Sequence, residues 1–155
     1  MIFELNLLNL TSINLEEMIA NGESFVRTFV LLTTSNITMV NTTVNGFFTT
    51  SDGGVIQSSN SNANIYNSTF INNTADVGGA IYLSCDNDQT CSYNIDNCTF
   101  IGNIAYTQGA GIYYDYFAPV MNLSTMTFIN NTAPYGATIA AYAYSLEITN
   151  LNSVE

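Results

Sequence analysis

The segment NCTFIGNIAYTQGAGIY at 97–113 is one copy of a motif that recurs along the chain. Related copies are NSTFINNTADVGGAIY at 67–82, TMTFINNTAPYGATIA at 125–140 and the fainter NTTVNGFFTTSDGGVI at 41–56. Repetition at a long period is typical of stacked copies of one supersecondary unit. The architecture can therefore be predicted before any single residue is interpreted.

The period is loose and extends over most of the chain. The fourth residue of each of the four copies is apolar, and these markers follow one another at steps of 26, 30 and 28 residues: Val44, Phe70, Phe100 and Phe128. Fainter echoes, LNLLN at 5–9 and ITNLN at 148–152, resemble ITMVN at 37–41. We expect residues 1–155 to form a single solenoid of about six coils, and to be a piece of a longer chain.

One repeat is predicted to contain two short strands joined by a turn. Residues 66–70 alternate between two faces, which is the pattern of a strand with one buried side. Residues 73–79 are rich in Asn, Asp and Gly, which favour turns. A second strand at 80–83 and a polar loop at 86–90 complete the unit.

Such a unit is too small to bury its apolar face alone, but stacked units can bury it together. We therefore predict an all-β fold, a right-handed parallel β-helix with equivalent strands about 4.8 Å apart. A β-sandwich is the alternative, although that fold would not require the same sequence motif to recur at equivalent positions. In the β-helix, two interior columns are expected, one of Phe70, Phe100 and Phe128 and one of Ile56, Ile81, Ile112 and Ile139.

The paired motifs resemble a known repeat. FINN at 70–73, FIGN at 100–103 and FINN at 128–131, with GGAI at 78–81, look like the FxxN and GGA(I/L/V) repeats of chlamydial polymorphic outer-membrane proteins. Similar repeats occur in protist surface proteins with a pectin-lyase-like β-helix. The resemblance covers about residues 41–140, and GAGI at 109–112 and GATI at 136–139 depart from the motif. It implies a surface-exposed β-helical stalk linked to adhesion.

Composition indicates an extracellular or cell-surface role. The chain has twelve acidic residues and one basic residue, Arg27, so its net charge is −11. Without a basic patch to neutralise phosphates, nucleic-acid binding is excluded. Only 8% of residues are charged while 47% are hydrophobic, so the exterior must be covered by Asn, Thr and Ser. Such a surface is poorly solvated unless something else coats it.

Covalent N-glycans are the predicted coat. Eight sequons with a non-proline middle residue are present, at Asn9, Asn36, Asn41, Asn67, Asn72, Asn97, Asn122 and Asn130. Asn67 and Asn97 each precede an inward Phe by three residues, and strand alternation therefore points them outward. Asn41 has the same relation to Val44. By contrast, Asn73, Asn103 and Asn131 at the turn are expected to form an inward, hydrogen-bonded ladder.

The three cysteines have different expected roles. Cys85 and Cys91 bracket a five-residue loop, which permits a disulfide in an oxidising compartment. Cys98 shares the parity of Phe100 and should be a small buried thiol. No metal site is expected, because the chain has no His and no CxxC pair.

The sequence predicts no catalytic residues and no cofactor. Nucleophile and base pairs usually need His or Lys, and neither occurs. Paired carboxylates could still cleave a sugar, and Asp86, Asp88 and Asp96 are the local cluster. A solvated loop is the simpler interpretation of the first two, and a calcium site is a minor alternative.

The tyrosines have two interpretations. A series near the second strand of each repeat could stack on neutral sugars, but packing between rungs is favoured: Tyr82, Tyr113, Tyr114, Tyr116, Tyr142 and Tyr144. A carbohydrate-binding or carbohydrate-cleaving β-helix therefore remains the alternative function.

Neither a signal peptide nor an apolar run long enough to span a membrane is evident. The main hypothesis is a non-enzymatic structural or adhesive segment of an extracellular or cell-surface glycoprotein. Its expected partners are N-glycans and neighbouring or self-associated β-helical repeats, with fibres formed by end-to-end stacking.

Overall fold

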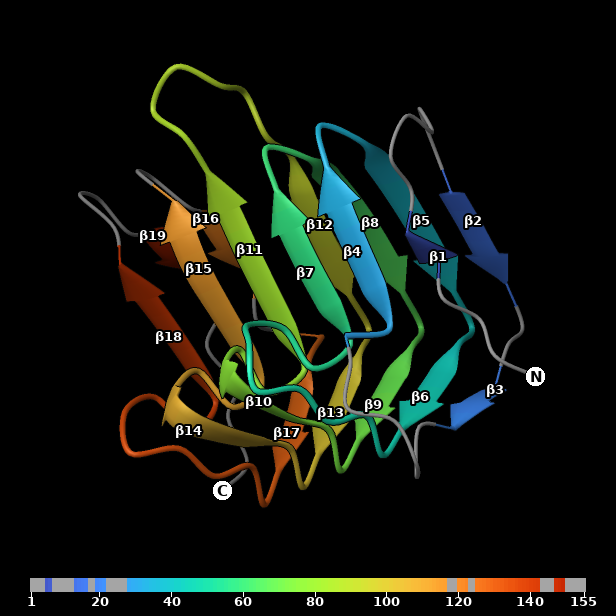
Figure 1. Cartoon of the computed structure of the whole chain (residues 1–155), viewed down its shortest axis with the longest axis vertical. Coiled ribbons are helices and arrows are strands. Elements are labelled where there is room, and N and C mark those ends of the chain that lie inside the picture. Colours follow the sequence, from blue (N-terminus) through green and yellow to red (C-terminus); the bar gives the residue numbers. More distant parts are fainter. Residues whose placement is uncertain are drawn as a thin grey trace.

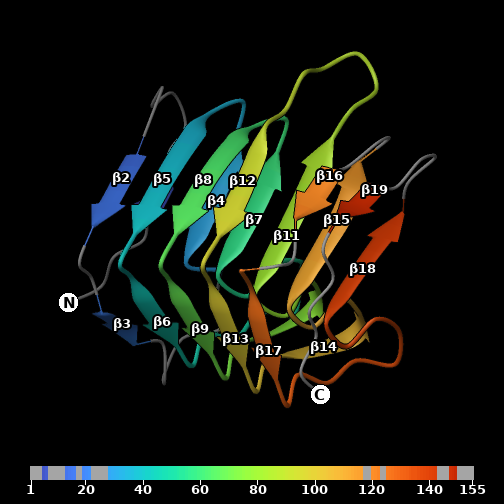
Figure 2. The ribbon, with the colours of Figure 1, turned by 180° about the vertical axis from the view of Figure 1, so that it is seen from behind.

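A computed structural model describes the backbone of residues 5–6, 13–16, 19–21, 28–116, 120–122, 125–142 and 147–149, and the side chains of 28–115 and 125–142. These residues form strands and turns, with no helix among them. The strands stack as successive rungs of a parallel β-solenoid (Figures 1 and 2). The predicted all-β, parallel β-helical fold is confirmed.

Three sheets form the walls of the solenoid, and every strand pair in them is parallel. The first sheet contains β1 (Leu5–Asn6), β4 (Val30–Thr33), β7 (Ile56–Ser59), β11 (Ile81–Cys85), β15 (Ile112–Tyr116) and β18 (Ile139–Tyr142). The second contains β2 (Ile13–Glu16), β5 (Asn36–Val40), β8 (Asn62–Tyr66) and β12 (Tyr93–Asp96). The third contains β3 (Ile19–Asn21), β6 (Thr43–Asn45), β9 (Thr69–Ile71), β13 (Thr99–Ile101) and β17 (Thr127–Ile129).

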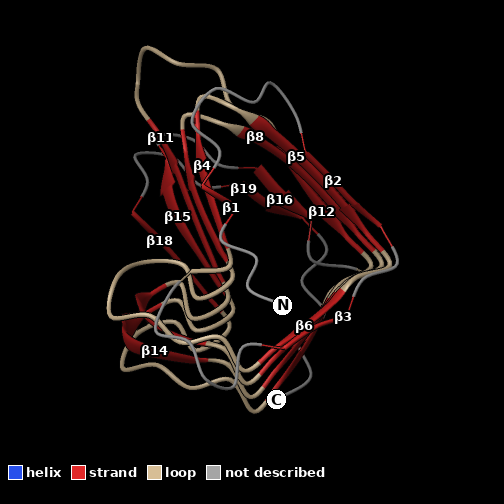
Figure 3. Cartoon of the chain, turned by 45° about the vertical axis from the view of Figure 1, so that its right-hand side comes forward, coloured by secondary structure: helices blue, strands red, loops and turns tan. Residues whose placement is uncertain are grey.

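Two shorter pairings complete the described strands. One joins β10 (Thr74–Val77) to β14 (Ile104–Gln108), and the other joins β16 (Val120–Asn122) to β19 (Glu147–Thr149). Viewed at an angle to the rungs, the three sheets enclose the interior, and β14 lies outside it beside the first sheet (Figure 3).

The number of coils is lower than predicted. The sequence predicts about six, whereas the residues that the structure describes make about four turns. The four turns run through β4, β7, β11, β15 and β18, which pair in that order. Of the faint echo at 5–9, the structure describes Leu5–Asn6, which form β1 in this sheet.

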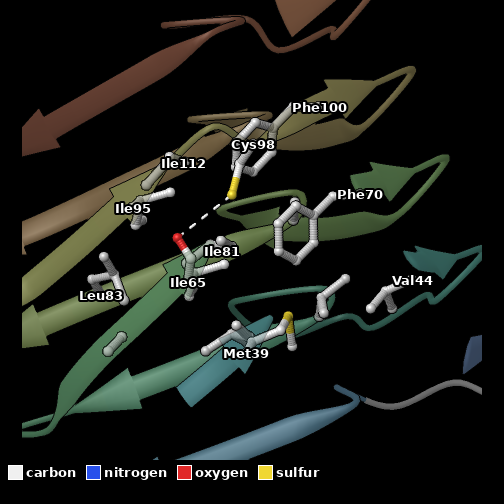
Figure 4. Packing of buried hydrophobic residues seen from close by; sticks show 14 of the residues in the cluster. Met39, Val44, Ile65, Phe70, Ile81, Leu83, Ile95, Cys98, Phe100 and Ile112 are labelled. Atoms are coloured by element: carbon white, nitrogen blue, oxygen red, sulfur yellow. Dashed lines mark hydrogen bonds between the residues drawn. The ribbon is translucent and has the colours of Figure 1, made fainter. Parts of the chain in front are cut away.

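The interior is built from in-register columns of apolar side chains (Figure 4). Val44 pairs with Phe70, which pairs with Phe100, which pairs with Phe128. The rings of Phe70 and Phe100 stack at 4.9 Å between centroids and 13° between planes, and Phe100 stacks on Phe128 at 4.9 Å and 11°. The predicted column of Ile56, Ile81, Ile112 and Ile139 is likewise in register.

The corner between the second and third sheets has one backbone geometry in three rungs. Asn41, Asn67 and Asn97 have φ of 51°, 51° and 50°, in the left-handed region that Asn tolerates better than most residues. This conformation interrupts the alternation of the strand, so the next residue points inward. Those residues, with the equivalent one in the fourth rung, are buried: Thr42, Ser68, Cys98 and Met126.

Glycine makes the corner before each strand of the first sheet from β7 onward. Gly78 has φ of 65°, and a Cβ there would lie 2.5 Å from the carbonyl oxygen of Ile81. Only glycine fits such a position without strain. The equivalent residues share the positive φ, which explains why the first glycine of the GGAI motif persists in every copy: Gly53, Gly109 and Gly136.

Candidate functional site

Two aromatic side chains lie on the outer face of the first sheet. Tyr82 of β11 is in register with Tyr113 of β15, and their rings stack at 5.5 Å and 14°. Tyr113 is only 6% exposed, so its ring faces are covered by protein. The interpretation of these tyrosines as packing between rungs is confirmed for this pair. Tyr114 points inward and is 3% exposed.

Acidic groups from three rungs lie close together here: Asp52 and Asp115 act on this tyrosine pair, and Asp76 acts on Asp52. The Tyr82 hydroxyl donates a hydrogen bond of 3.2 Å to Oδ2 of Asp115. Partial burial raises the pKa of the Asp52 carboxyl, and the negative charges of Asp76 and Asp115 raise it further. Burial, together with the charges of Asp115 and Asp52, also raises the pKa of Tyr82 and Tyr113, so that both phenols remain neutral donors.

This acidic cluster is missed by the sequence analysis, because its members are far apart in the chain. A signal was available for two of them, since Asp52 and Asp76 both precede the glycine corner in aligned copies, as SDGG and ADVGG. Within the part of the chain that the structure describes, no three His, Cys, Asp or Glu side chains are placed to hold a metal ion. The arrangement offers hydrogen-bond donors and acceptors, and its negative charge would repel anionic ligands.

The acidic residues that the sequence analysis grouped lie elsewhere. Asp86 and Asp88 are exposed in the loop after β11, and Oδ2 of Asp86 accepts a hydrogen bond of 2.7 Å from Nδ2 of Asn60. Asp96 ends β12, where its carboxylate accepts a hydrogen bond from the hydroxyl of Thr125. These contacts stabilise turns and bring no reactive pair together.

The cysteines divide between the surface loop and the core. Cys85 and Cys91 form a disulfide across the loop that follows β11, with 6.2 Å between their Cα atoms. Cys98 is buried and 1% exposed, which confirms its predicted inward orientation. Burial raises the pKa of its thiol to about 11, and the thiol therefore stays protonated and unreactive at neutral pH.

All the sequon asparagines with described side chains are exposed: Asn36, Asn41, Asn67, Asn72, Asn97 and Asn130. Asn9 lies outside the described residues, and only the backbone of Asn122 is described, in β16. Exposure is the geometric requirement for an attached glycan, and the outward orientation predicted for Asn41, Asn67 and Asn97 agrees with it. Whether any of these sites is modified stays a prediction.

An amide ladder runs through the interior at the third corner of the coil. Nδ2 of Asn73 donates to Oδ1 of Asn103 at 3.0 Å, and Nδ2 of Asn103 donates to Oδ1 of Asn131 at 2.9 Å. Oδ1 of Asn103 also accepts a hydrogen bond from the backbone N–H of Asn73, and Oδ1 of Asn131 accepts one from the backbone N–H of Asn103, both at 3.0 Å. Asn73 and Asn103 are fully buried. The ladder predicted from the repeated FxxN motif is confirmed.

The side chains of the ladder also form hydrogen bonds with backbone carbonyl groups. Nδ2 of Asn103 donates to the carbonyl oxygen of Phe70 at 3.0 Å, and Nδ2 of Asn131 donates to that of Phe100 at 3.0 Å. The backbone N–H of Phe47, at the equivalent position of the preceding rung, donates to Oδ1 of Asn73. Each inward Asn thus joins neighbouring rungs at a corner where the strand ladder is interrupted.

Comparison with known families agrees with this repeat. A sequence model of the Chlamydia polymorphic membrane protein repeat matches residues 67–84 and 97–115. Each matched segment spans a third-sheet strand, a residue of the amide ladder and the next strand of the first sheet. The repeats and the β-solenoid fit a segment of a surface or outer-membrane protein. No curated protein and no solved structure gives a significant match to the chain.

A search of the described residues for a helix that could cross a membrane finds none.

We predict that Asn103→Ala will destabilise the fold strongly. It removes the side-chain hydrogen bonds to Asn131 and to the Phe70 carbonyl, and it leaves the buried backbone N–H of Asn73 without its acceptor. Each unsatisfied buried group costs about 1–3 kcal/mol, so the expected loss in urea denaturation is roughly 3 kcal/mol or more. Asn94→Ala is the matched control, because it removes an exposed Asn–Asn hydrogen bond of 2.8 Å to Asn64. Equal losses in the two variants would contradict the role of the ladder.

We predict that Asp52→Asn will raise the melting temperature at neutral pH. The folded-state pKa of Asp52 lies above the ordinary value of 3.8, so the folded protein binds this proton more tightly than the unfolded chain. The stability that this site contributes is present below the ordinary value and is lost as pH rises through the folded-state pKa. Asparagine does not ionise, so the variant does not lose this stability as pH rises. The increase in melting temperature should therefore vanish below pH 3.8, the ordinary pKa of the carboxyl group. Asp88→Asn, in the exposed loop, should change little; an unchanged melting temperature for Asp52→Asn would contradict the cluster.

Proposed function

We propose that this chain is a non-enzymatic structural or adhesive segment of a cell-surface or extracellular glycoprotein. The observation that carries the proposal is the uninterrupted stacking of like residues through the rungs, Phe on Phe, Ile on Ile and Asn on Asn. Such a solenoid is a rigid spacer whose length grows by one strand spacing, about 4.8 Å, per rung. The matched polymorphic membrane protein repeat supports a surface location.

The exterior of the solenoid supports a glycan coat. Exposed positions carry amide and hydroxyl groups where most proteins carry Lys and Glu, and a net charge of −11 comes from few charged residues overall. The six described sequon asparagines are all exposed. Glycans at these sites would solvate a surface that its own side chains solvate poorly. The disulfide between Cys85 and Cys91 suits the oxidising compartment in which such glycans are attached.

The carbohydrate-binding alternative has less support. Sugar rings stack on exposed aromatic faces, and the Tyr113 ring is covered. Tyr82 uses its hydroxyl to hold Asp115. The stacked geometry of this pair therefore serves the packing of the first sheet, and we do not propose carbohydrate cleavage.

We predict that natively sourced protein carries N-glycans at Asn41, Asn67 or Asn97. Glycopeptide mass spectrometry should use a protease that cleaves at aromatic residues, because Arg27 offers the single tryptic site. Glycosidase-treated material is the control. If all exposed sequons are bare, the glycan coat is wrong, and the asparagines serve as outer ladder elements instead.

End-to-end association is part of the same proposal. A parallel solenoid presents unpaired strand edges at its end rungs, and these can accept further rungs from a second copy. We predict a weight-average mass that rises with protein concentration in sedimentation equilibrium, reversed by dilution. A concentration-independent monomer over the same range would contradict fibre formation and would leave the scaffold role to the surrounding chain.

A further inference from the structure

Three sequon asparagines lie one above another on a single outer corner. Tyr66 is in register with Val40 and with Asp96, and the residues that follow these three are Asn41, Asn67 and Asn97. Each of the three has φ near 50°, so their Cα–Cβ bonds leave the backbone in the same direction. All three side chains are exposed. We call this set the outer sequon column.

The amide groups in this column touch. Nδ2 of Asn97 donates to Oδ1 of Asn67 at 2.6 Å, which holds the two side chains parallel. Nδ2 is the atom to which a glycan is attached, and attachment replaces one of its two hydrogens. Two glycans on Asn67 and Asn97 would therefore leave the surface in parallel, one strand spacing of about 4.8 Å apart. A pyranose ring with its acetamido group is wider than that spacing.

A second column shows a different arrangement. Asn72 and Asn130 are also exposed sequon residues, but the residue between them, on the intervening rung, is Gly102. A Cβ at Gly102 would lie 2.5 Å from Oδ1 of Asn72, so the Asn72 side chain leans over the space that the glycine leaves open. Glycans on Asn72 and Asn130 would be two rungs apart, about 9.6 Å, with no side chain between them.

We infer that glycan occupancy on folded molecules follows alternate rungs. Within the outer sequon column, Asn67 and Asn97 exclude one another, whereas Asn41 and Asn97 are compatible. Asn72 and Asn130 are compatible as well. This inference rests on the proposed glycan coat and specifies which combinations of sites the folded solenoid accepts.

The mechanism is selection by folding. Glycans are attached to the chain as it is made, before the rungs stack, so both sites can receive one. A chain carrying glycans at Asn67 and Asn97 must then separate the two amides or tilt both sugars to close the corner. That chain should fold less completely than either singly modified chain, and the secretory pathway should retain it.

The test uses the whole chain, secreted from a eukaryotic host, with two sequons kept in each variant. Unwanted sequons are removed at the third position, because changing the asparagine would disturb its positive φ. The adjacent-rung variant keeps Asn67 and Asn97, with the substitutions Thr11→Ala, Thr38→Ala, Thr43→Ala, Thr74→Ala, Ser124→Ala and Thr132→Ala. The matched alternate-rung variant keeps Asn41 and Asn97, with Thr69→Ala in place of Thr43→Ala. Single-site versions keep only one of Asn41, Asn67 and Asn97.

Intact-mass spectrometry counts glycans per molecule in the secreted and the retained fractions. For the alternate-rung variant, the doubly modified fraction should equal the product of the two single-site occupancies. For the adjacent-rung variant, we expect the secreted doubly modified fraction to fall roughly tenfold below that product, which corresponds to a crowding cost of about 1.4 kcal/mol. The missing species should appear in the retained fraction.

Each outcome decides the inference. If the secreted adjacent-rung variant carries both glycans as often as the product of the two single-site occupancies, the exclusion is wrong, and the glycan coat is unaffected. Equal depletion in both paired variants would also overturn it, because spacing would then not matter. Absence of glycan from all single-site versions would overturn the coat and the exclusion together.

Discussion

The in-register parallel stacking of rungs at one fixed spacing is the constraint on which the rest of this structure depends. Because each residue lies above its counterpart in the next turn, any side chain must be compatible with the equivalent side chain about 4.8 Å away. Flat aromatic rings meet this requirement, and Phe70, Phe100 and Phe128 stack with centroids 4.9 Å apart. Branched Ile side chains meet it by interlocking in the column from Ile56 to Ile139.

The same constraint explains how polar groups can be buried without charge partners. An amide carries both a donor and an acceptor, so a column of Asn side chains satisfies itself. Asn73, Asn103 and Asn131 do this at the corner of the coil and bind backbone groups as well. A carboxylate cannot donate and would repel its own copy. The Asp52, Asp76 and Asp115 cluster accordingly lies on the exterior, where the pKa of Asp52 is still raised.

Stacking also limits what the surface can carry. Long charged side chains would repeat at every rung, whereas Asn and Thr repeat without repulsion, as in the outer amide bond between Asn97 and Asn67. The described surface therefore carries few charged side chains and is periodic, and in the proposed function it depends on an external coat. A bulky group cannot repeat at every rung, and the sequence meets this limit with glycine at Gly102 but not between Asn67 and Asn97.

The repeated text alone determined the fold class, the Phe and Ile columns, the inward Asn ladder and the burial of Cys98, because period and parity fix which face each residue occupies. The number of turns in the described residues is lower than predicted, because similarity to the repeat does not by itself show that a segment closes a full turn. Only the tertiary structure brought Asp76 and Asp115 close to Asp52 beside Tyr82, because these residues lie on different rungs. It alone also showed that the side chain of Asn97 touches that of Asn67. Contacts between rungs depend on exact register, and loops of variable length between the copies hide that register from the sequence.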